Sequence, residues 1–249
     1  MKSLKKALSA MDYIILAEGG DVSVTDLSRQ LNVPKGTIHR ILSTLVQNKY
    51  LQQDPHTRKY GLGLRFIDIE CVLNRRQTLR TAISPLLKQL YLNCKETVNA
   101  AVLVENEIEF IDRYESEMHL RVAIDIGTRF PAHCTATGKI MLSTLSDEEL
   151  QKLYAPAREL CKLTEKSVGT YPELRLALEK VRKEGVARDF EECLIGVHCI
   201  ASAIVNREGK AVAAVSISGP RERLTIQKMD DLKPLLLDTT EKISNEFRS

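Results

Sequence analysis

The feature that most constrains this chain is a pair of short amphipathic segments near its N-terminus, separated by the turn Asn32-Val33-Pro34. The second segment has apolar residues at the spacing i, i+3, i+4 and i+7, namely Ile38, Ile41, Leu42 and Leu45. This spacing predicts a helix that buries one stripe. The first segment carries Leu27 and Leu31 one turn apart, with Thr25 as its expected N-cap. Two short helices joined by a tight turn form a helix-turn-helix arrangement.

The second of these helices carries polar residues away from its buried stripe. They are Lys35, Gly36, Thr37, His39 and Arg40. A short hydroxyl can bind phosphate oxygens, a glycine permits close approach, and an arginine can make two hydrogen bonds to guanine. The segment therefore predicts a recognition helix for a groove of double-stranded DNA. The alternative is that these positions form a solvated surface or face a protein partner.

A β-hairpin is predicted directly after this helix. Residues 50–53 and 58–62 flank the turn Asp54-Pro55-His56-Thr57. Arg58 and Lys59 follow the tip, where they would contact phosphates or a minor groove. The first 65 residues contain ten Lys and Arg against five Asp and Glu, whereas the rest contains 26 against 28. A basic unit attached to a slightly acidic one fits a DNA-binding arm on a sensing body.

Further helices are predicted on both sides of this unit. Four apolar residues in the first helix recur at helical spacing and are expected to be buried, namely Leu4, Leu8, Met11 and Ile15. Residues 63–82 predict a linker helix, and a separate helix is expected to begin at Ser84-Pro85. The expected domains are a winged helix-turn-helix over 1–65, the linker helix over 66–82 and a second domain over 83–249.

The second domain is predicted to mix strands and helices. A hairpin is expected over 97–104 and 108–114, around the polar turn Glu105-Asn106-Glu107. Further strands are expected at 120–124, 186–190, 199–205 and 211–218, and helices at 136–145, 147–154, 172–184 and 225–247. Hairpins with helices before, between and after them indicate an α+β domain built on an antiparallel sheet.

Polar chemistry in this domain is concentrated in residues 133–139, 189–192, 196–199 and 216–220. The first segment leads into a helix, whose free amide groups suit a carboxylate. Ser216 and Ser218 are two residues apart, so their side chains share one face of a strand. These features predict a binding site for a small molecule.

Two other kinds of site remain open at this point. A metal or redox site would use Cys134, Cys193, Cys199 and His198, with Asp189 nearby. Consecutive residues of a strand point to opposite faces, so His198 and Cys199 do not easily share one site. A catalytic site would use Cys134 or Cys199 as nucleophile and His133 or His198 as base, although no residue that orients the base can be identified.

Motifs over essentially the whole chain, in one order, resemble the IclR family of transcriptional regulators. They are Pro34–Arg40, Tyr60–Gly63, Glu96–Val98, His133–Lys139, Asp189–Glu192, Gly196–Cys199 and Ser216–Pro220. The resemblance implies a winged-helix domain, a linker helix and a GAF-like effector-binding domain. It further implies a homodimer or a dimer of dimers that binds a palindromic operator, with neither enzymatic activity nor a cofactor.

The resemblance also implies an effector pocket at Ala136, Thr137, Asp189, Val197, Cys199, Ser216 and Ser218. Effectors in this family are commonly small organic acids, sugar acids or aromatic compounds. The chain departs from the family pattern at three places. Gly36 stands where many members have Ser, Ala136-Thr137 where some have Gly-Ala, and His198 where Arg is common.

Composition places further bounds on the chain. No stretch approaches the ~20 apolar residues that span a bilayer, and the N-terminus does not have the pattern of a signal peptide. The six cysteines are scattered without a C-x-x-C pair, which favours free thiols. A cytoplasmic protein that does not bind membranes is therefore expected.

Overall fold

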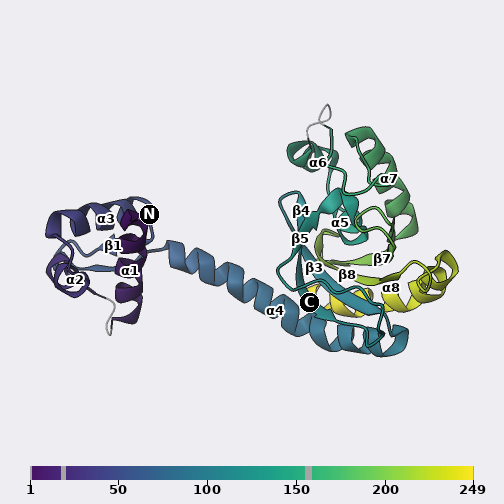
Figure 1. The fold of residues 1–249 in the computed structure, drawn as a ribbon, viewed down its shortest axis with the longest axis horizontal. Helices are drawn as coiled ribbons and strands as arrows, with labels where there is room; N and C mark the ends of the chain where they lie inside the picture. The colour runs from purple at the N-terminus through teal and green to yellow at the C-terminus, as the bar shows by residue number, and fades with distance from the viewer. Residues whose placement is uncertain (1, 18–20, 155–158, 249) are drawn as a thin grey trace. The chain divides into compact units, whose positions relative to one another are not determined.

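Two units follow one another along the chain in the computed structural model, Met1–Arg76 and Gln77–Ser249 (Figure 1). The structure describes residues 2–17, 21–154 and 159–248, with residues 2, 3 and 71–77 described by their backbone alone. The boundary between the units falls inside the segment 66–82.

The N-terminal unit contains α1 (Lys2–Leu16), α2 (Val24–Leu31), α3 (Lys35–Gln47), β1 (Leu51–Gln53) and β2 (Tyr60–Leu62). The cap of α2 is Ser23 and not the predicted Thr25. The Ser23 hydroxyl accepts a hydrogen bond from the amide of Asp26, and the Asp26 carboxylate accepts one from the amide of Ser23. This reciprocal pairing satisfies two amide groups that the helix itself leaves without partners.

The apolar stripe of α3 is confirmed, because Ile38, Ile41 and Leu42 are buried. The stripe predicted for α1 is wrong. Leu4 and Leu8 are more than half exposed, whereas Ala10 and Ile14 are buried. The small side chain of Ala10 allows the backbone of α1 to approach its neighbours closely, which leaves the larger apolar residues outside.

The predicted hairpin is confirmed, since β1 and β2 pair antiparallel. The Asp54 carboxylate shapes the turn by accepting hydrogen bonds from the amides of His56 and Thr57, at 2.8 and 2.7 Å. Arg58 takes a left-handed conformation at φ 61°. These contacts place Arg58 and the following Lys59 at the start of the returning strand.

Helix α4 is continuous from Arg65 to Cys94, with Pro85 inside it. The separate helix expected at Ser84-Pro85 is therefore wrong. Four apolar residues spaced along α4 on both sides of the proline belong to one buried core, namely Leu79, Ile83, Leu87 and Leu90. Burial of this stripe offsets the backbone hydrogen bond that the proline cannot donate.

The C-terminal unit is built on a six-stranded antiparallel sheet in the order β5-β4-β3-β8-β7-β6. The strands are β3 (Thr97–Val104), β4 (Glu107–Tyr114), β5 (Arg129–Pro131), β6 (Ala187–Phe190), β7 (Val197–Val205) and β8 (Ala211–Pro220). The strand predicted at 120–124 is wrong, because these residues pair with no strand and β5 forms the edge instead.

Helices cover both faces of this sheet (Figure 1). On one face α4 and α8 (Ile226–Arg248) share a core with the strands. The other face carries α5 (Ala136–Leu142), α6 (Asp147–Leu153) and α7 (Tyr171–Glu184). The predicted α+β class is confirmed. Among the described residues, no helix has the length and apolar character that a membrane span requires.

Gly138 allows α5 to lie directly on the 3-10 turn Ala132–Cys134. A Cβ at this position would lie 2.1 Å from the carbonyl oxygen of Ala132. We expect Gly138→Ala to lower the free energy of unfolding of the C-terminal unit by about 2 kcal/mol, because backbone has to move. Urea denaturation measures the change. Gly36→Ala is the control, since a Cβ there meets nothing within 4 Å; an equal loss in both variants would contradict this account.

Candidate DNA-binding surface and ligand cavity

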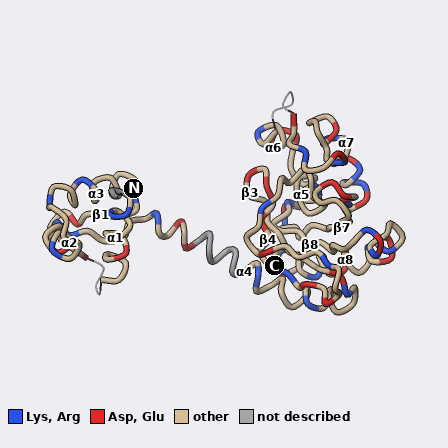
Figure 2. The backbone as a smooth tube through the Cα atoms, viewed as in Figure 1, with Lys and Arg blue, Asp and Glu red and all other residues tan. Residues whose placement is uncertain are grey.

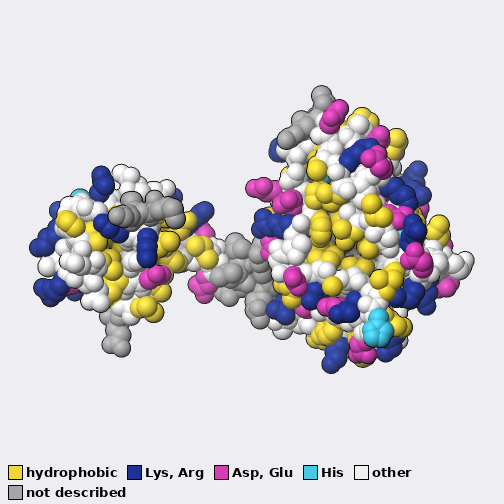
Figure 3. Space-filling model, viewed as in Figure 1, with side chains coloured by type: hydrophobic (Ala, Val, Ile, Leu, Met, Phe, Trp, Pro, Cys, Tyr) yellow, Lys and Arg dark blue, Asp and Glu magenta, His cyan; other side chains and the backbone are white. Residues whose placement is uncertain are grey.

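The predicted DNA-contact residues of α3 lie on its outer side. Lys35, Gly36, His39 and Arg40 are exposed and Thr37 is half-buried, opposite the buried Ile38 and Leu42. Helix α3 packs against β1 of the hairpin. Figures 2 and 3 show basic residues distributed over this unit.

The hairpin adds two further basic side chains to this unit. Arg58 and Lys59 are both exposed. The unit therefore presents cationic and hydroxyl groups on the helix and cationic groups on the hairpin, which are the groups that contact phosphates and base edges in DNA.

A small cavity of about 20 Å³ lies on the face of the sheet that α5 covers. Residues from α5, five strands and two loops line it. All seven residues that the resemblance assigned to an effector pocket are among them, namely Ala136, Thr137, Asp189, Val197, Cys199, Ser216 and Ser218. Residues more than 80 positions apart in the sequence thus come together around one cavity.

The floor of the cavity is a polar row across three neighbouring strands. The strand register pairs Asp189 with Cys199 and Cys199 with Ser218. The Cys199 thiol donates to the Ser218 hydroxyl at 3.1 Å. Asn99, which is 1% exposed, also donates to that hydroxyl at 3.4 Å. Asn99 was not predicted, since a single asparagine in an apolar strand gives no signal of a site.

The N-terminal end of α5 forms another wall of the cavity. The hydroxyl of Thr135 caps this helix by accepting a hydrogen bond from the amide of Gly138 at 2.9 Å. Thr135, Ala136 and Thr137 all line the cavity. The first amide groups of a helix have no carbonyl partners within it, so this wall holds hydrogen-bond donors beside the Thr137 hydroxyl. The Thr135 hydroxyl is already bonded to Ala132 and Gly138.

Five apolar residues of the lining were not predicted. They are Phe110, Val122, Ile124, Phe130 and Leu194. Phe110 and Phe130 meet edge to face, with ring centroids 6.3 Å apart. The only signal for this wall is the alternation of Leu120, Val122 and Ile124. Val122 and Ile124 face the cavity, Leu120 is exposed, and the three residues pair with no strand.

Among the described residues that line the cavity, Asp189 is the one Asp or Glu, and it is 2% exposed. Burial, with the nearby Glu192 carboxylate, raises the pKa of Asp189 to about 7. Its Oδ1 accepts a hydrogen bond from the amide of Glu192 at 2.6 Å. The described residues that line the cavity include no Lys, Arg or His. Near neutral pH this carboxyl can therefore donate or accept a hydrogen bond.

The raised pKa predicts how stability depends on pH. Asp189 holds its proton up to about pH 7 in the folded chain, against an ordinary pKa of 3.8. The folded state therefore binds more protons between these values, so the free energy of unfolding falls as pH rises across this window, by up to about 1.4 kcal/mol per pH unit from this group. Asp189→Asn is expected to remove that contribution.

Urea denaturation of the wild type and of Asp189→Asn at about pH 5, 6 and 7 tests this expectation. The stability of the variant relative to the wild type should increase with pH. If the free energy of unfolding of the two proteins depended on pH in the same way, Asp189 would be ionised throughout the window.

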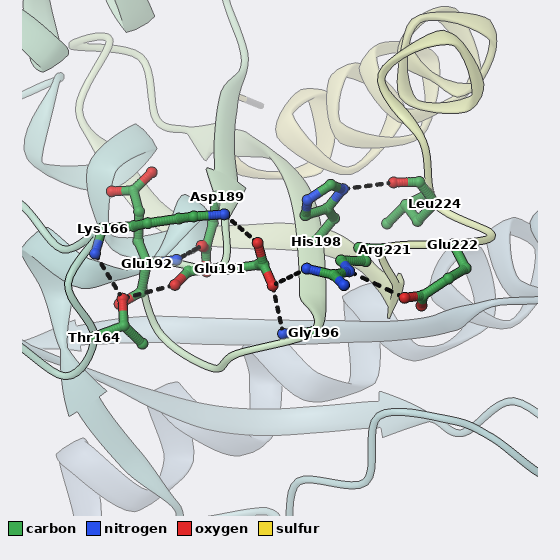
Figure 4. Close-up of polar contacts among 10 residues, drawn as sticks. All are labelled: Thr164, Lys166, Asp189, Glu191, Glu192, Gly196, His198, Arg221, Glu222 and Leu224. Atoms are coloured by element: carbon green, nitrogen blue, oxygen red, sulfur yellow. Dashed lines mark hydrogen bonds and ion pairs between the residues drawn. The ribbon is translucent and has the colours of Figure 1, made fainter.

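The loop after β6 contributes Cys193 and Leu194 to one side of the cavity. Figure 4 shows the contacts of Glu191 that fix this loop. The Glu191 carboxylate pairs with Lys166 and accepts hydrogen bonds from the amide of Gly196 at 2.8 Å and from Arg221 at 3.0 Å. These partners, with Lys166 as the largest cause, lower the pKa of Glu191 to about 2. Cys193, within this loop, lines the cavity. An ionised Glu191 thus holds the cavity wall in place.

The alternative metal or redox site is not supported by the geometry. His198 faces away from the cavity, where its Nδ1 lies 3.0 Å from the carbonyl oxygen of Leu224 and its ring packs edge to face on Phe190. Among the described residues, no group of three or more His, Cys, Asp and Glu is placed to hold a metal ion. Burial raises the pKa of the Cys134, Cys193 and Cys199 thiols, which disfavours the reactive thiolate.

The residues considered for catalysis do not form a nucleophile and base. His133 is buried and its Nε2 lies 2.8 Å from the carbonyl oxygen of Cys161. Burial lowers the pKa of His133. His198 and Cys199 lie on opposite faces of β7, because consecutive strand residues alternate.

Comparison with known proteins covers both units. Residues 72–245 match the family described as "Bacterial transcriptional regulator IclR C-terminal", and residues 3–55 match the "IclR helix-turn-helix domain". The HTH-type transcriptional repressor AllR of Escherichia coli K12 is 32% identical over 243 residues, which cover 98% of this chain and 89% of the repressor. AllR of Salmonella typhi is also 32% identical, with the same coverage.

Solved structures share the fold over the whole chain. The crystal structure of the Thermotoga maritima IclR matches with a TM-score of 0.68 at 28% identity and covers 100% of both chains. A Rhodococcus transcriptional regulator matches with a TM-score of 0.68 at 26% identity, over 99% of this chain and 98% of that one. Sequence, fold and cavity agree: this chain belongs to the IclR family of transcriptional regulators, in which a helix-turn-helix unit binds DNA under the control of a small-molecule-binding unit.

Proposed function

We propose that this chain is a cytoplasmic transcriptional repressor that binds a palindromic operator and is gated by a small organic, sugar or aromatic acid bound in the cavity. The observation that carries this proposal is the convergence of the seven predicted effector residues on one cavity. Its relatives named as repressors support the direction of regulation.

In this proposal the DNA contacts divide between α3 and the hairpin. Lys35, Gly36, Thr37, His39 and Arg40 enter the major groove, with Arg40 reading a guanine. Arg58 and Lys59 contact the phosphates beside it. The support is their exposure on the outer side of α3 and on the hairpin.

A homodimer or a dimer of dimers is part of the same proposal, because a two-fold protein reads both halves of a palindrome. The exposed side chains of Leu4, Leu8 and Ile15 on α1 support it. A row of large apolar side chains on one helix favours a protein partner over solvent.

The effector would be held by the polar row and the start of α5. Protonated Asp189, Ser216, Ser218 and the amides near Thr137 supply hydrogen bonds, and Val197 with the two phenylalanines supplies apolar contact. Cys199 positions the Ser218 hydroxyl through its thiol. An acid can bind without a cationic partner because Asp189 and the amides donate to it.

The test has two parts. An operator is first selected from a random pool of duplexes with the full-length protein. Lactate, gluconate and 4-hydroxybenzoate, one probe for each class of acid, are then screened for an increase in Tm; the last is the ligand named for a Microbacterium hydrocarbonoxydans homologue. We expect one class to bind and to change operator affinity at least about fivefold. Failure to select any operator would refute the proposed function, and binding without a change in affinity would refute the gating.

A further inference from the structure

Strand β4 faces the ligand cavity on one side and helix α4 on the other. Phe110 of this strand lines the cavity. The next residue, Ile111, packs in the core that contains α4 and α8. The register between β3 and β4 shifts here, from Ala101 opposite Phe110 to Ala100 opposite Asp112, so Ile111 is an extra residue. Such a β-bulge breaks the alternation of faces and is a place where a strand bends.

Because of the bulge, Asp112 is placed on the α4 side of the sheet, although Phe110, two residues before it, is on the cavity side. Asp112 is 3% exposed, and its Oδ1 lies 3.4 Å from Nε of Arg80 on α4. Its other oxygen, Oδ2, has no hydrogen-bond partner among the described residues. Oδ1 also accepts a hydrogen bond from the amide of Arg113 at 3.0 Å. Among the described residues Arg80 is the one cation paired with this buried carboxylate, which is therefore sensitive to the position of Arg80.

A second polar contact joins the same two elements. The hydroxyl of Tyr114 lies 3.2 Å from the hydroxyl of Ser84. Arg80 and Ser84 are four residues apart, so they share one face of α4. The side chain of Arg80 is half-exposed, which allows it to turn into solvent, whereas Asp112 cannot follow it. The pair can therefore exist in a closed and an open form.

We propose that β4 transmits occupancy of the cavity to α4, with Asp112 and Tyr114 as the positioning residues. A ligand that displaces Phe110 shifts the bulge, and the shift opens or closes the Asp112–Arg80 and Tyr114–Ser84 contacts. Helix α4 is continuous with the segment that leaves the DNA-binding unit, since it begins at Arg65. The proposal rests on the proposed function, because it describes how the cavity regulates operator binding.

The first test uses the full-length protein, the selected operator and whichever of the three acids raises Tm. Asp112→Asn keeps the shape of the side chain and removes its charge, and Tyr114→Phe removes only the hydroxyl. We expect both variants to bind the acid within about twofold of the wild type. The ratio of operator Kd with and without the acid should fall at least about threefold towards unity. Asp238→Asn, which removes an exposed carboxylate paired with Lys242, is the matched control and should leave the ratio unchanged.

The proposal would be overturned if the ratio of operator Kd with and without the acid were unchanged in both variants. It would also be overturned if the ratio fell only because the variants bind the acid more weakly. A merely structural role for Asp112 would lower Tm without altering the ratio. If the proposed function itself is wrong, the wild type will not bind an operator or will not bind any of the acids. That result differs from the failure of the coupling, in which the wild type binds both.

The second test needs no ligand. Hydrogen exchange over residues 78–86 of α4 is compared in the wild type, in Phe110→Leu and in Val197→Ala, which trims the cavity from β7. We expect Phe110→Leu to alter exchange in this segment at least about twofold. Val197→Ala should leave it unchanged. Equal exchange in all three proteins would overturn the proposal even if none of the acids binds.

Discussion

Replacing Thr37 and Arg40 together by alanine is expected to lower the affinity for the selected operator about 100-fold. Each side-chain contact to a base edge contributes about 1–3 kcal/mol of discrimination. Arg40 is exposed on α3, and Thr37 is half-buried one turn earlier. Alanine favours helices, and neither side chain belongs to the buried stripe, so the free energy of unfolding should change by less than about 0.5 kcal/mol. Fluorescence anisotropy with the operator and a scrambled duplex, at one salt concentration, measures the loss.

The matched control is Lys59→Ala on the hairpin. A phosphate contact carries no sequence information, so this variant should weaken binding to both duplexes by a similar factor and reduce the salt slope by about one. If the double variant on α3 behaved in the same way as Lys59→Ala, α3 would contact only the phosphates. If it retained full affinity for the operator, α3 would not be the recognition helix.

The helix-turn-helix could be predicted from the sequence because its signal is local. The spacing of Ile38, Ile41 and Leu42 defines both the helix and its buried side. The same reasoning failed for α1, where two apolar rows compete. Leu4 and Leu8 form the larger row, but Ala10 and Ile14 are buried. Which row faces inward depends on the shape of the neighbouring helices, and the spacing of one segment contains no information about that shape.

Two errors in the C-terminal unit have a related cause. A proline favours the first turn of a helix and disfavours the interior of one, so Ser84-Pro85 predicts the start of a new helix. The apolar residues Ile83 and Leu87, one turn apart across the proline, show that one core holds a single helix together. At 120–124, alternation was interpreted as a strand, but Val122 and Ile124 face the cavity.

The polar part of the cavity could be predicted through the resemblance, whereas the apolar part could not. Asp189 and the two serines stand in motifs with a recognisable order. Phe110 and Phe130 do not, because an aromatic residue on a strand has the same pattern in a core as in a cavity wall. Their role follows only from the way β4 and β5 meet at the edge of the sheet.

Lys139→Met is expected to lower the free energy of unfolding of the C-terminal unit by about 3–5 kcal/mol. Lys139 on α5 forms an ion pair with Glu192 in the loop after β6, and both side chains are nearly buried. Lys139 contacts Oε1 of Glu192, and the Oε2 atom has no hydrogen-bond partner among the described residues. Removal of the ammonium group leaves a buried carboxylate without its cation, which has to be protonated or exposed. Urea denaturation at neutral pH measures the loss.

Two controls separate this effect from the loss of a long side chain. Lys242→Met removes an exposed lysine paired with Asp238 and should cost less than about 1 kcal/mol. Combining Lys139→Met with Glu192→Met removes both charges and should recover most of the lost stability, because an apolar pair of similar volume often replaces a buried ion pair at little cost. If the double variant were as unstable as Lys139→Met, the loss would come from packing around α5. A small loss in Lys139→Met itself would mean that Glu192 reaches solvent, and that the loop beside the cavity is free to move.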